Sequence, residues 1–149
     1  MILVSEDPIN AADQLAIFEK SVPDAGGIVS FSGQVRPKAD GESVTGLHLQ
    51  AYHPMTTTGI EEAVQKAQSR WPLNGIRVLH RVGTILTGET IVFVATASEH
   101  RRAAFESADF LMDYLKTDAI FWKKELTENG EKWVEPRAQD YDDSARWIK

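Results

Sequence analysis

The chain has 149 residues, 42% of them hydrophobic, and a formal net charge of −6 at pH 7. We expect one globular domain over residues 1–149, long enough to bury a substantial core. The acidic balance argues against broad binding of nucleic acid or of an anionic membrane, which both require a net basic face. Cysteine is absent, which excludes disulfides, thiolate catalysis and cysteine-bound zinc. Because no stretch resembles a signal peptide or a membrane span, a cytoplasmic protein is expected.

The apolar patterns predict strands and helices in the order β-α-β-β-α-β-β-α-β-β. The predicted strands cover residues 2–4, 26–37, 44–53, 76–85, 89–98, 119–127 and 131–135. The predicted helices cover residues 7–22, 55–71 and 98–116. This mixture indicates an α+β fold with mainly antiparallel pairing.

Local signals refine the first half of this pattern. Asp7 is expected to cap the first helix, with Pro8 at the first helical position. Gly33 could form a bulge in the strand 26–37. We expect that strand to pair antiparallel with 44–53 across a polar turn.

In the second half, the strand 89–98 is almost wholly apolar, so we expect it to lie inside a sheet with both faces covered. The third helix should bury one side against the core. Its expected buried residues are Ala104, Ala108, Leu111 and Leu115. The last two strands flank "ENG" and should form a hairpin, whereas the tail from Pro136 gives no clear prediction.

The third helix begins with an unusual concentration of positive charge. Ser98 is a good N-cap, but His100, Arg101 and Arg102 follow in the first turn. A cation at the positive end of a helix dipole costs on the order of 0.3–1 kcal/mol, whereas the free N–H groups there favour an anion. The arrangement is therefore consistent with a phosphate or carboxylate site. The alternative is that the arginines pair with acidic residues elsewhere or extend into water.

A second group of cations lies in "LKTDAIFWKKE", residues 115–125. Lys116 closes the third helix, where a cation is favourable without any function. Lys123 and Lys124 are strand neighbours that face opposite sides, and we expect Lys123 to point inward with Phe121. An amine held against aromatic surface can have a lowered pKa and act as acid, base or nucleophile. Alternatively, the lysines only protect an edge strand from unwanted pairing.

The rest of the sequence is informative mainly through the functional motifs that it does not contain. Arg36 ends its strand before Pro37, and taken alone it reads as an arginine in solvent. The four histidines, at positions 48, 53, 80 and 100, have no zinc-site spacing, so no metal is expected. The nucleophile elbow, the P-loop and the dinucleotide-binding glycine pattern are also absent.

Five segments of the chain are informative through their order. They are "GGIVSFSGQVR", "RWPLNGIRVLHRVGTILTGE", "ASEHRRAAF", "LMDYLKTDAIFWKKE" and "GEKWVE". In order and spacing they resemble the large catalytic subunit of molybdopterin synthase, from about residue 26 to residue 137. The resemblance implies an α/β hammerhead fold with an additional small antiparallel β subdomain.

The resemblance also implies an activity. The family consists of sulfur transferases that convert cyclic pyranopterin monophosphate (precursor Z) into molybdopterin during molybdenum cofactor synthesis. The sulfur arrives as a thiocarboxylate on the Gly-Gly tail of a small ubiquitin-like partner, so no cofactor and no cysteine of the enzyme are required. The family works as a heterotetramer around a homodimer of large subunits. The alternative is a non-catalytic adaptor that binds the sulfur-carrier tail without turnover.

By the same resemblance, Lys116 and Lys123 match the lysines of the family's "LK" and "WK(K/R)E" motifs and are the expected catalytic residues. The residues expected to bind substrate are Gln34, Val35, Arg36, His100, Arg101, Lys116, Lys123, Lys124, Glu125 and Arg137. A dianionic phosphate and a carboxy-terminal anion would account for so many cations in an acidic protein. The chain departs from the family pattern at Gln34, where a basic residue is common, at Ile120, where proline is frequent, and in "QAYHPM".

Overall fold

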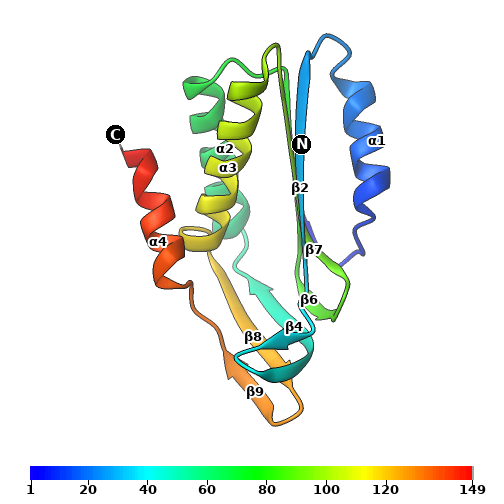
Figure 1. Ribbon diagram of the computed structural model, residues 1–149, viewed down its shortest axis with the longest axis vertical. Coiled ribbons are helices and arrows are strands. Elements are labelled where there is room, and N and C mark those ends of the chain that lie inside the picture. The colour runs from blue at the N-terminus through cyan, green and yellow to red at the C-terminus, as the bar shows by residue number, and fades with distance from the viewer. Residues whose placement is uncertain (149) are drawn as a thin grey trace.

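A computed structural model describes residues 1–148 and shows helices around a long sheet, with a smaller sheet at one end (Figure 1). The helices are α1 (Ala11–Ser21), α2 (Met55–Arg70), α3 (Arg101–Thr117) and α4 (Ala138–Ala145), followed by a 3-10 turn, η1 (Arg146–Ile148). The strands are β1 (Ile2–Ser5), β2 (Gly27–Gln34), β3 (Lys38–Ala39), β4 (Glu42–Ala51), β5 (Gly75–Arg81), β6 (Gly83–Leu86), β7 (Thr90–Ser98), β8 (Phe121–Thr127) and β9 (Gly130–Trp133). The α+β class is confirmed.

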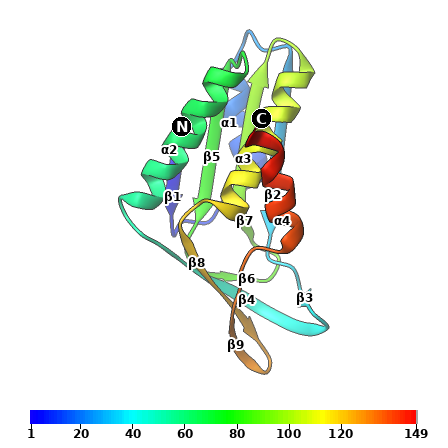
Figure 2. The same cartoon turned by 90° about the vertical axis from the view of Figure 1, so that its left-hand side faces the viewer.

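The large sheet has the strand order β1-β5-β7-β2, in which only β1 and β5 are parallel. Helices α2 and α3 cover one face, and α1 covers the other (Figures 1 and 2). Strand β7 lies inside this sheet and is buried from Val92 to Ser98. The prediction of an internal strand with both faces covered is therefore confirmed.

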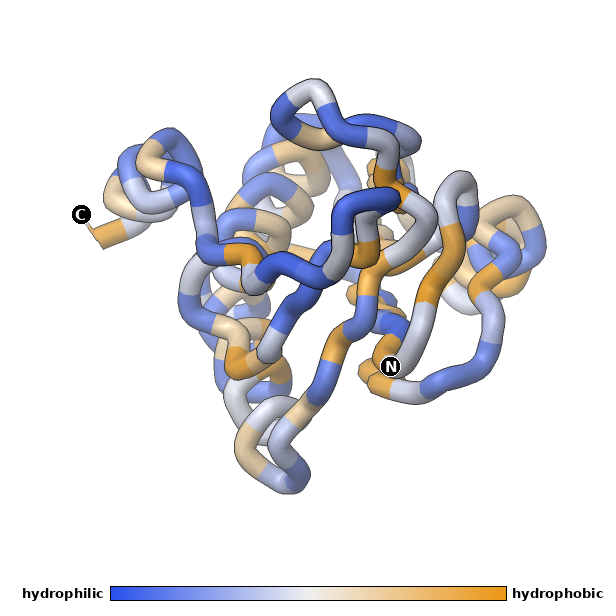
Figure 3. Tube along the Cα trace, turned by 90° about the horizontal axis from the view of Figure 1, so that it is seen from below, coloured by the Kyte–Doolittle hydropathy of each residue, from blue (hydrophilic) through white to orange (hydrophobic). Residues whose placement is uncertain are grey.

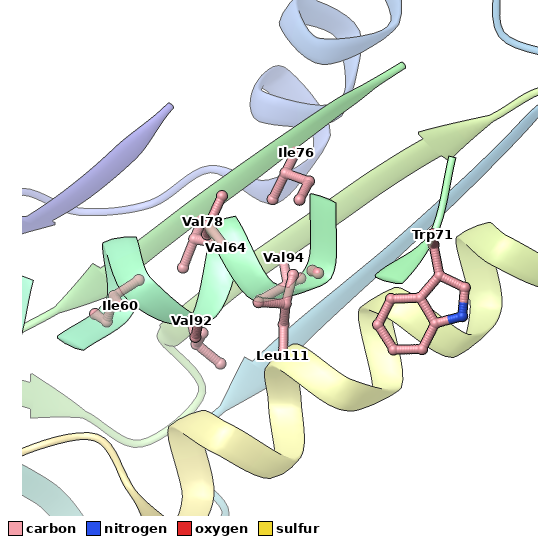
Figure 4. Packing of buried hydrophobic residues seen from close by; sticks show 10 residues of the cluster. Ile60, Val64, Trp71, Ile76, Val78, Val92, Val94 and Leu111 are labelled. Atoms are coloured by element: carbon pink, nitrogen blue, oxygen red, sulfur yellow. The ribbon is translucent and has the colours of Figure 1, made fainter. Parts of the chain in front are cut away.

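Alternation along the two internal strands divides the core between the faces of the large sheet. Val78 and Val94 are register partners that join the cluster beneath α2 and α3, together with Leu111 (Figure 4). Their neighbours Leu79 and Phe93 are also partners, and they pack toward α1. Successive side chains of a strand point to opposite faces, so two adjacent register pairs supply two separate clusters.

The small sheet has the order β3-β4-β8-β9, and β6 also pairs with β4. Seen from this end of the molecule, the trace alternates between hydrophilic and hydrophobic residues (Figure 3). One face is buried in a third cluster. The members of that cluster are Val35, Val44, Leu47, Leu49 and Ile85. This antiparallel unit agrees with the additional β subdomain that the resemblance implied.

The expected pairing between the strands at 26–37 and 44–53 is wrong, because β2 pairs with β7 while β4 belongs to the small sheet. The register of β2 shifts between Gly33 and Gln34, as the bulge prediction allowed. The chain then leaves the large sheet, since the side chain of Val35 is buried in the small-sheet cluster. Val35 thus marks the point at which the chain passes from the core of the large sheet to that of the small one.

The single strand expected at 76–85 is also wrong, because the segment forms β5 in the large sheet and β6 in the small one. The break lies at Val82, whose N–H donates to the Ser5 carbonyl, and at Gly83, which has a φ of 82°. A left-handed residue ends the strand, and glycine adopts that conformation without steric cost. The segment therefore passes directly from one sheet to the other.

Both predicted helix caps differ from the observed ones. The cap of α1 is Asn10, whose side chain accepts a hydrogen bond from the Asp13 N–H (3.1 Å), rather than Asp7. Helix α3 is capped by His100, because Ser98 still belongs to β7 and its hydroxyl donates to the His100 carbonyl. Each helix starts two or three residues later than expected, and for α3 the reason is that β7 extends to Ser98.

The remaining predictions for the second half are confirmed. Ala104, Ala108 and Leu111 are buried on α3, Leu115 is partly buried, and β8 and β9 form the expected hairpin. The ambiguous tail forms α4 and η1. No helix within residues 1–148 combines the length and apolar character that a membrane span requires.

One buried hydroxyl connects the start of β8 to the start of α2. Thr56 is fully buried, accepts from the Tyr52 N–H (2.8 Å) and donates to the Ile120 carbonyl (2.6 Å). Ile120 immediately precedes β8. This pair of bonds therefore sets where the strand begins relative to the helix.

We predict that Thr56→Val lowers the free energy of unfolding by about 1–3 kcal/mol, because valine keeps the shape but leaves two backbone groups without a partner. Thr58→Val is the matched control, since Thr58 is exposed on the same helix. The control should change stability by no more than about 0.5 kcal/mol in urea denaturation. Equal losses of unfolding free energy in the two variants would show that the Thr56 hydroxyl does not connect β8 to α2.

Candidate active site

The candidate site lies where the two sheets meet. Helix α3 leads directly into β8 at this junction, and α4 begins beside them (Figures 1 and 2). Lys116 comes from the end of α3, Lys123 from β8, Arg36 from the segment after β2, and Asp140 from α4. The charges of the other three all act on the Lys123 amine, so the fold brings together residues that are far apart in sequence.

Lys123 is the partly buried cation of this group. Its pKa is lowered to about 8, first by burial and then by the positive charge of Lys116; Glu125 opposes the shift and Arg36 adds to it. Lys123 lies on the same face of β8 as Phe121, because strand residues two apart point the same way. An amine with this pKa exchanges its proton near neutral pH, which an exposed lysine does not.

Lys124 occupies the opposite face of β8. Its amine forms an ion pair with Glu131 (2.9 Å) and lies 4.6 Å from the centre of the Trp133 ring. Trp122 is also on this face and is packed edge-on against Trp133. The expected division between an inward Lys123 and an outward Lys124 agrees with these contacts.

Arg137 and Asp140 form the start of α4. The carboxylate of Asp140 accepts from the Arg137 N–H and from its guanidinium, each at 2.9 Å. The hydrogen bond from Arg137 lowers the pKa of Asp140, and the charge of Lys116 acts in the same direction. Asp140 was not among the site residues predicted from the sequence. No signal in the sequence pointed to it, because the capping-box pattern begins with serine or threonine and the residue three positions earlier is Arg137.

Three of the predicted site cations have no ion-pair partner in the part of the chain that the structure describes. Within residues 1–148, Lys116, Lys123 and Arg36 form no salt bridge, and Lys116 and Arg36 are exposed. By contrast, Arg81 pairs with Glu89 at 3.3 Å. Cations that repel one another and form no ion pair among the described residues weaken the fold, and they suit an anion site.

The other predicted site residues are placed differently. His100 and Arg101 start α3, about 22 Å along the helix axis from Lys116 at a rise of 1.5 Å per residue, and both are exposed. Val35 is 2% exposed and belongs to the small-sheet core. Gln34 is exposed at the end of β2. A single chain therefore does not bring the two predicted cation groups together.

The sequence comparisons agree with one another. The MoaE protein family model matches residues 4–118. The molybdopterin synthase catalytic subunit of Vibrio cholerae is 48% identical over 123 residues, covering 83% of this chain and 82% of that protein. The catalytic subunit of Escherichia coli is 42% identical over 146 residues, covering 98% and 97%. The chain belongs to the MoaE family.

A solved structure supports the same assignment. The molybdopterin biosynthesis MoaE protein from Burkholderia ambifaria superimposes with a TM-score of 0.80 at 38% identity, covering 99% of this chain and 98% of that one. The family model ends before β8 and α4, but the relatives that match nearly end to end include both. Lys123 and Asp140 thus lie within the region shared with MoaE proteins.

Two hollows of this MoaE chain lie outside the lysine group. One, of about 640 Å³, lies between α2, α3 and the C-terminal segment and is lined by Tyr114, Tyr141 and Trp147 among others. The other, of about 370 Å³, borders β1 and β4. Neither is lined by Lys116 or Lys123. Lys116 and Arg36 are exposed and Lys123 is only partly buried, so the lysine group is open to solvent in the isolated chain.

We predict a pH-dependent stabilisation by Lys123→Met. The lowered pKa means that the Lys123 charge opposes folding below pH 8, and that this cost fades as pH rises from about 8 toward the ordinary lysine value of 10.5. The variant should therefore gain on the order of 1–3 kcal/mol of unfolding free energy at pH 7, with a smaller gain toward pH 10.

Lys124→Met is the control for this measurement. It loses the ion pair with Glu131 and the contact with Trp133, so its stability should fall slightly or stay unchanged. Denaturant titrations of both variants from about pH 6 to about pH 10 test the prediction. This range begins below the lowered pKa of Lys123 and ends near the ordinary pKa of a lysine. A stability gain in Lys123→Met that does not change with pH would contradict it.

Proposed function

We propose that the chain is the catalytic subunit of a molybdopterin synthase, an enzyme of molybdenum cofactor biosynthesis. Its reaction is the transfer of sulfur from the C-terminal thiocarboxylate of a small ubiquitin-like partner to cyclic pyranopterin monophosphate. The observation that carries the proposal is the partly buried Lys123, which lies beside Lys116 and Arg36 without an ion pair among residues 1–148, in a chain of the MoaE family. The names of the relatives support the activity.

The lysine group suits this chemistry in two ways. Lys116 and Arg36 are exposed cations that can bind the substrate phosphate or the carboxy-terminal anion of the partner. Lys123 has a pKa of about 8, so its amine can donate a proton to a reacting group and accept one from it. We assign Lys116 and Lys123 to catalysis, and Arg36, Glu125, Arg137 and the backbone around Gln34 and Val35 to the surrounding wall, with Lys124 outward at its rim.

The proposal includes a partner subunit. A structure of the same fold from Helicobacter pylori, 21% identical, is described as a complex of subunits 1 and 2 of molybdopterin-converting factor, so that protein works beside a second subunit. We infer a small sulfur-carrier partner for this chain as well. A cytoplasmic heterotetramer around a homodimer stays a prediction. The separation of Arg101 from Lys116 is compatible with it, since only another chain can bring the two cation groups together.

We predict that Lys123→Ala impairs molybdopterin formation far more than Lys124→Ala, and that Lys116→Ala nearly abolishes it. Lys123 and Lys116 face the site, whereas Lys124 is engaged by Glu131 on the other face. The assay supplies cyclic pyranopterin monophosphate and thiocarboxylated partner to folded protein. The loss for Lys123→Ala should reach about 100-fold, the usual contribution of an acid–base group. Equal effects of the two neighbouring lysines would refute the assignment.

A separate prediction concerns the start of α3. Arg101→Ala should weaken substrate binding and leave the melting temperature unchanged or slightly higher, because it removes a cation from the positive end of the helix. Within residues 1–148, Arg101 has no ion pair to lose. Calorimetric titration with substrate and a thermal melt check the two parts. A clear fall in melting temperature with unchanged affinity would make Arg101 a structural residue.

A further inference from the structure

His80 is a buried residue beside the lysine group for which the sequence offered no role. It lies near the end of β5 and is 8% exposed. Its ring is stacked on that of Phe121, with the ring centres 4.1 Å apart and the planes inclined by 23°. The contact therefore joins a strand of the large sheet to the first residue of β8.

The hydrogen bonding of His80 defines its protonation. Nδ1 lies 2.9 Å from the Arg81 carbonyl oxygen, and because a carbonyl can only accept, Nδ1 carries the hydrogen. The ring is neutral, since its pKa is lowered to about 4 by burial and by the charges of Lys123 and Lys116, against the effect of the Arg81 bond. The neighbouring Arg81 is itself paired with Glu89. His80 thus presents a flat uncharged ring to Phe121, close enough to Lys123 and Lys116 for their charges to act on it.

Phe121 transmits this contact to the amine. Phe121 and Lys123 lie on the same face of β8, opposite Ala51 and Leu49 of β4. The Phe121 ring is held between His80 and the small-sheet core, on the face of β8 that also carries Lys123. If Phe121 were free to swing out, water would reach the amine.

We propose that His80 is a positioning residue, whose neutral ring stacks on Phe121 and thereby keeps the Lys123 amine in its partly buried place. The proposal rests on the proposed function for its catalytic consequence but not for its structural one. His80 does not react; its flat face is the feature that matters. A phenylalanine should therefore replace it, whereas an aliphatic residue of similar volume should not.

The test compares His80→Phe, which keeps a flat ring, with His80→Leu, which does not. The pKa of Lys123 is followed by NMR of isotope-labelled lysine side chains. In His80→Leu it should rise by about one unit because the amine becomes hydrated, and in His80→Phe it should stay within roughly 0.3 units of the parent. His48→Ala is the control, since His48 is exposed in the small sheet, and it should leave the Lys123 pKa unchanged.

The pH profile of sulfur transfer supplies the second readout. The titration of Lys123 in the profile should move to higher pH in His80→Leu and return to the parent position in His80→Phe. A raised Lys123 pKa in His80→Phe, or an unchanged one in a folded His80→Leu, would overturn the proposal. If His80→Leu does not fold, His80→Phe alone decides. Failure of the proposed function would abolish the activity of the parent chain but leave the NMR result standing.

Discussion

The packing of Phe121 between two hydrophobic clusters is the contact on which the site depends. The ring packs against the cluster beneath α2 and α3 and also against the small-sheet cluster, and among residues 1–148 it alone does both. Strand β8 leaves α3 at this point, so the ring determines how the small sheet is attached to the large one. Lys123 follows two residues later on the same face. Its amine is partly buried because Phe121 is packed, and no charged partner is needed to draw it inward.

Holding the Lys123 amine in this partly buried place lowers the stability of the fold, but it gives the amine a lowered pKa that suits proton transfer. A lysine in water keeps its proton well above neutral pH, but one that is partly dehydrated beside Lys116 and Arg36 holds its charge less favourably. Glu125 and, after it, Asp140 oppose this effect, but the carboxylate of Asp140 is also engaged by Arg137. The apolar clusters on either side of Phe121 must supply the free energy that keeps the amine in place. Strain of this kind is common at active sites, where maximal stability and function are in conflict.

Short-range patterns predicted much of this structure, and long-range contacts account for what they missed. Strand alternation placed Lys123 and Lys124 on opposite faces, and apolar composition identified β7 as internal, since both depend only on neighbouring residues. The false pairing of β2 with β4 arose because nothing local shows that Val35 is buried in a different core. The roles of His80 and Asp140 were equally invisible, since one depends on stacking across 41 positions of sequence and the other on a helix in the ambiguous tail.

The distribution of ion pairs separates cations that support the fold from those available to a ligand. Arg146 holds the C-terminal turn to Asp109 and Asp113 of α3, and Arg137 caps α4 through Asp140. A chain with 22 acidic residues has carboxylates in excess, yet Lys116, Lys123 and Arg36 have no such partner among the described residues. Their mutual repulsion is a cost that a bound anion would remove. A ligand that binds only the folded state stabilises it more the tighter it binds, so a substrate anion would both occupy this site and relieve the repulsion among its cations.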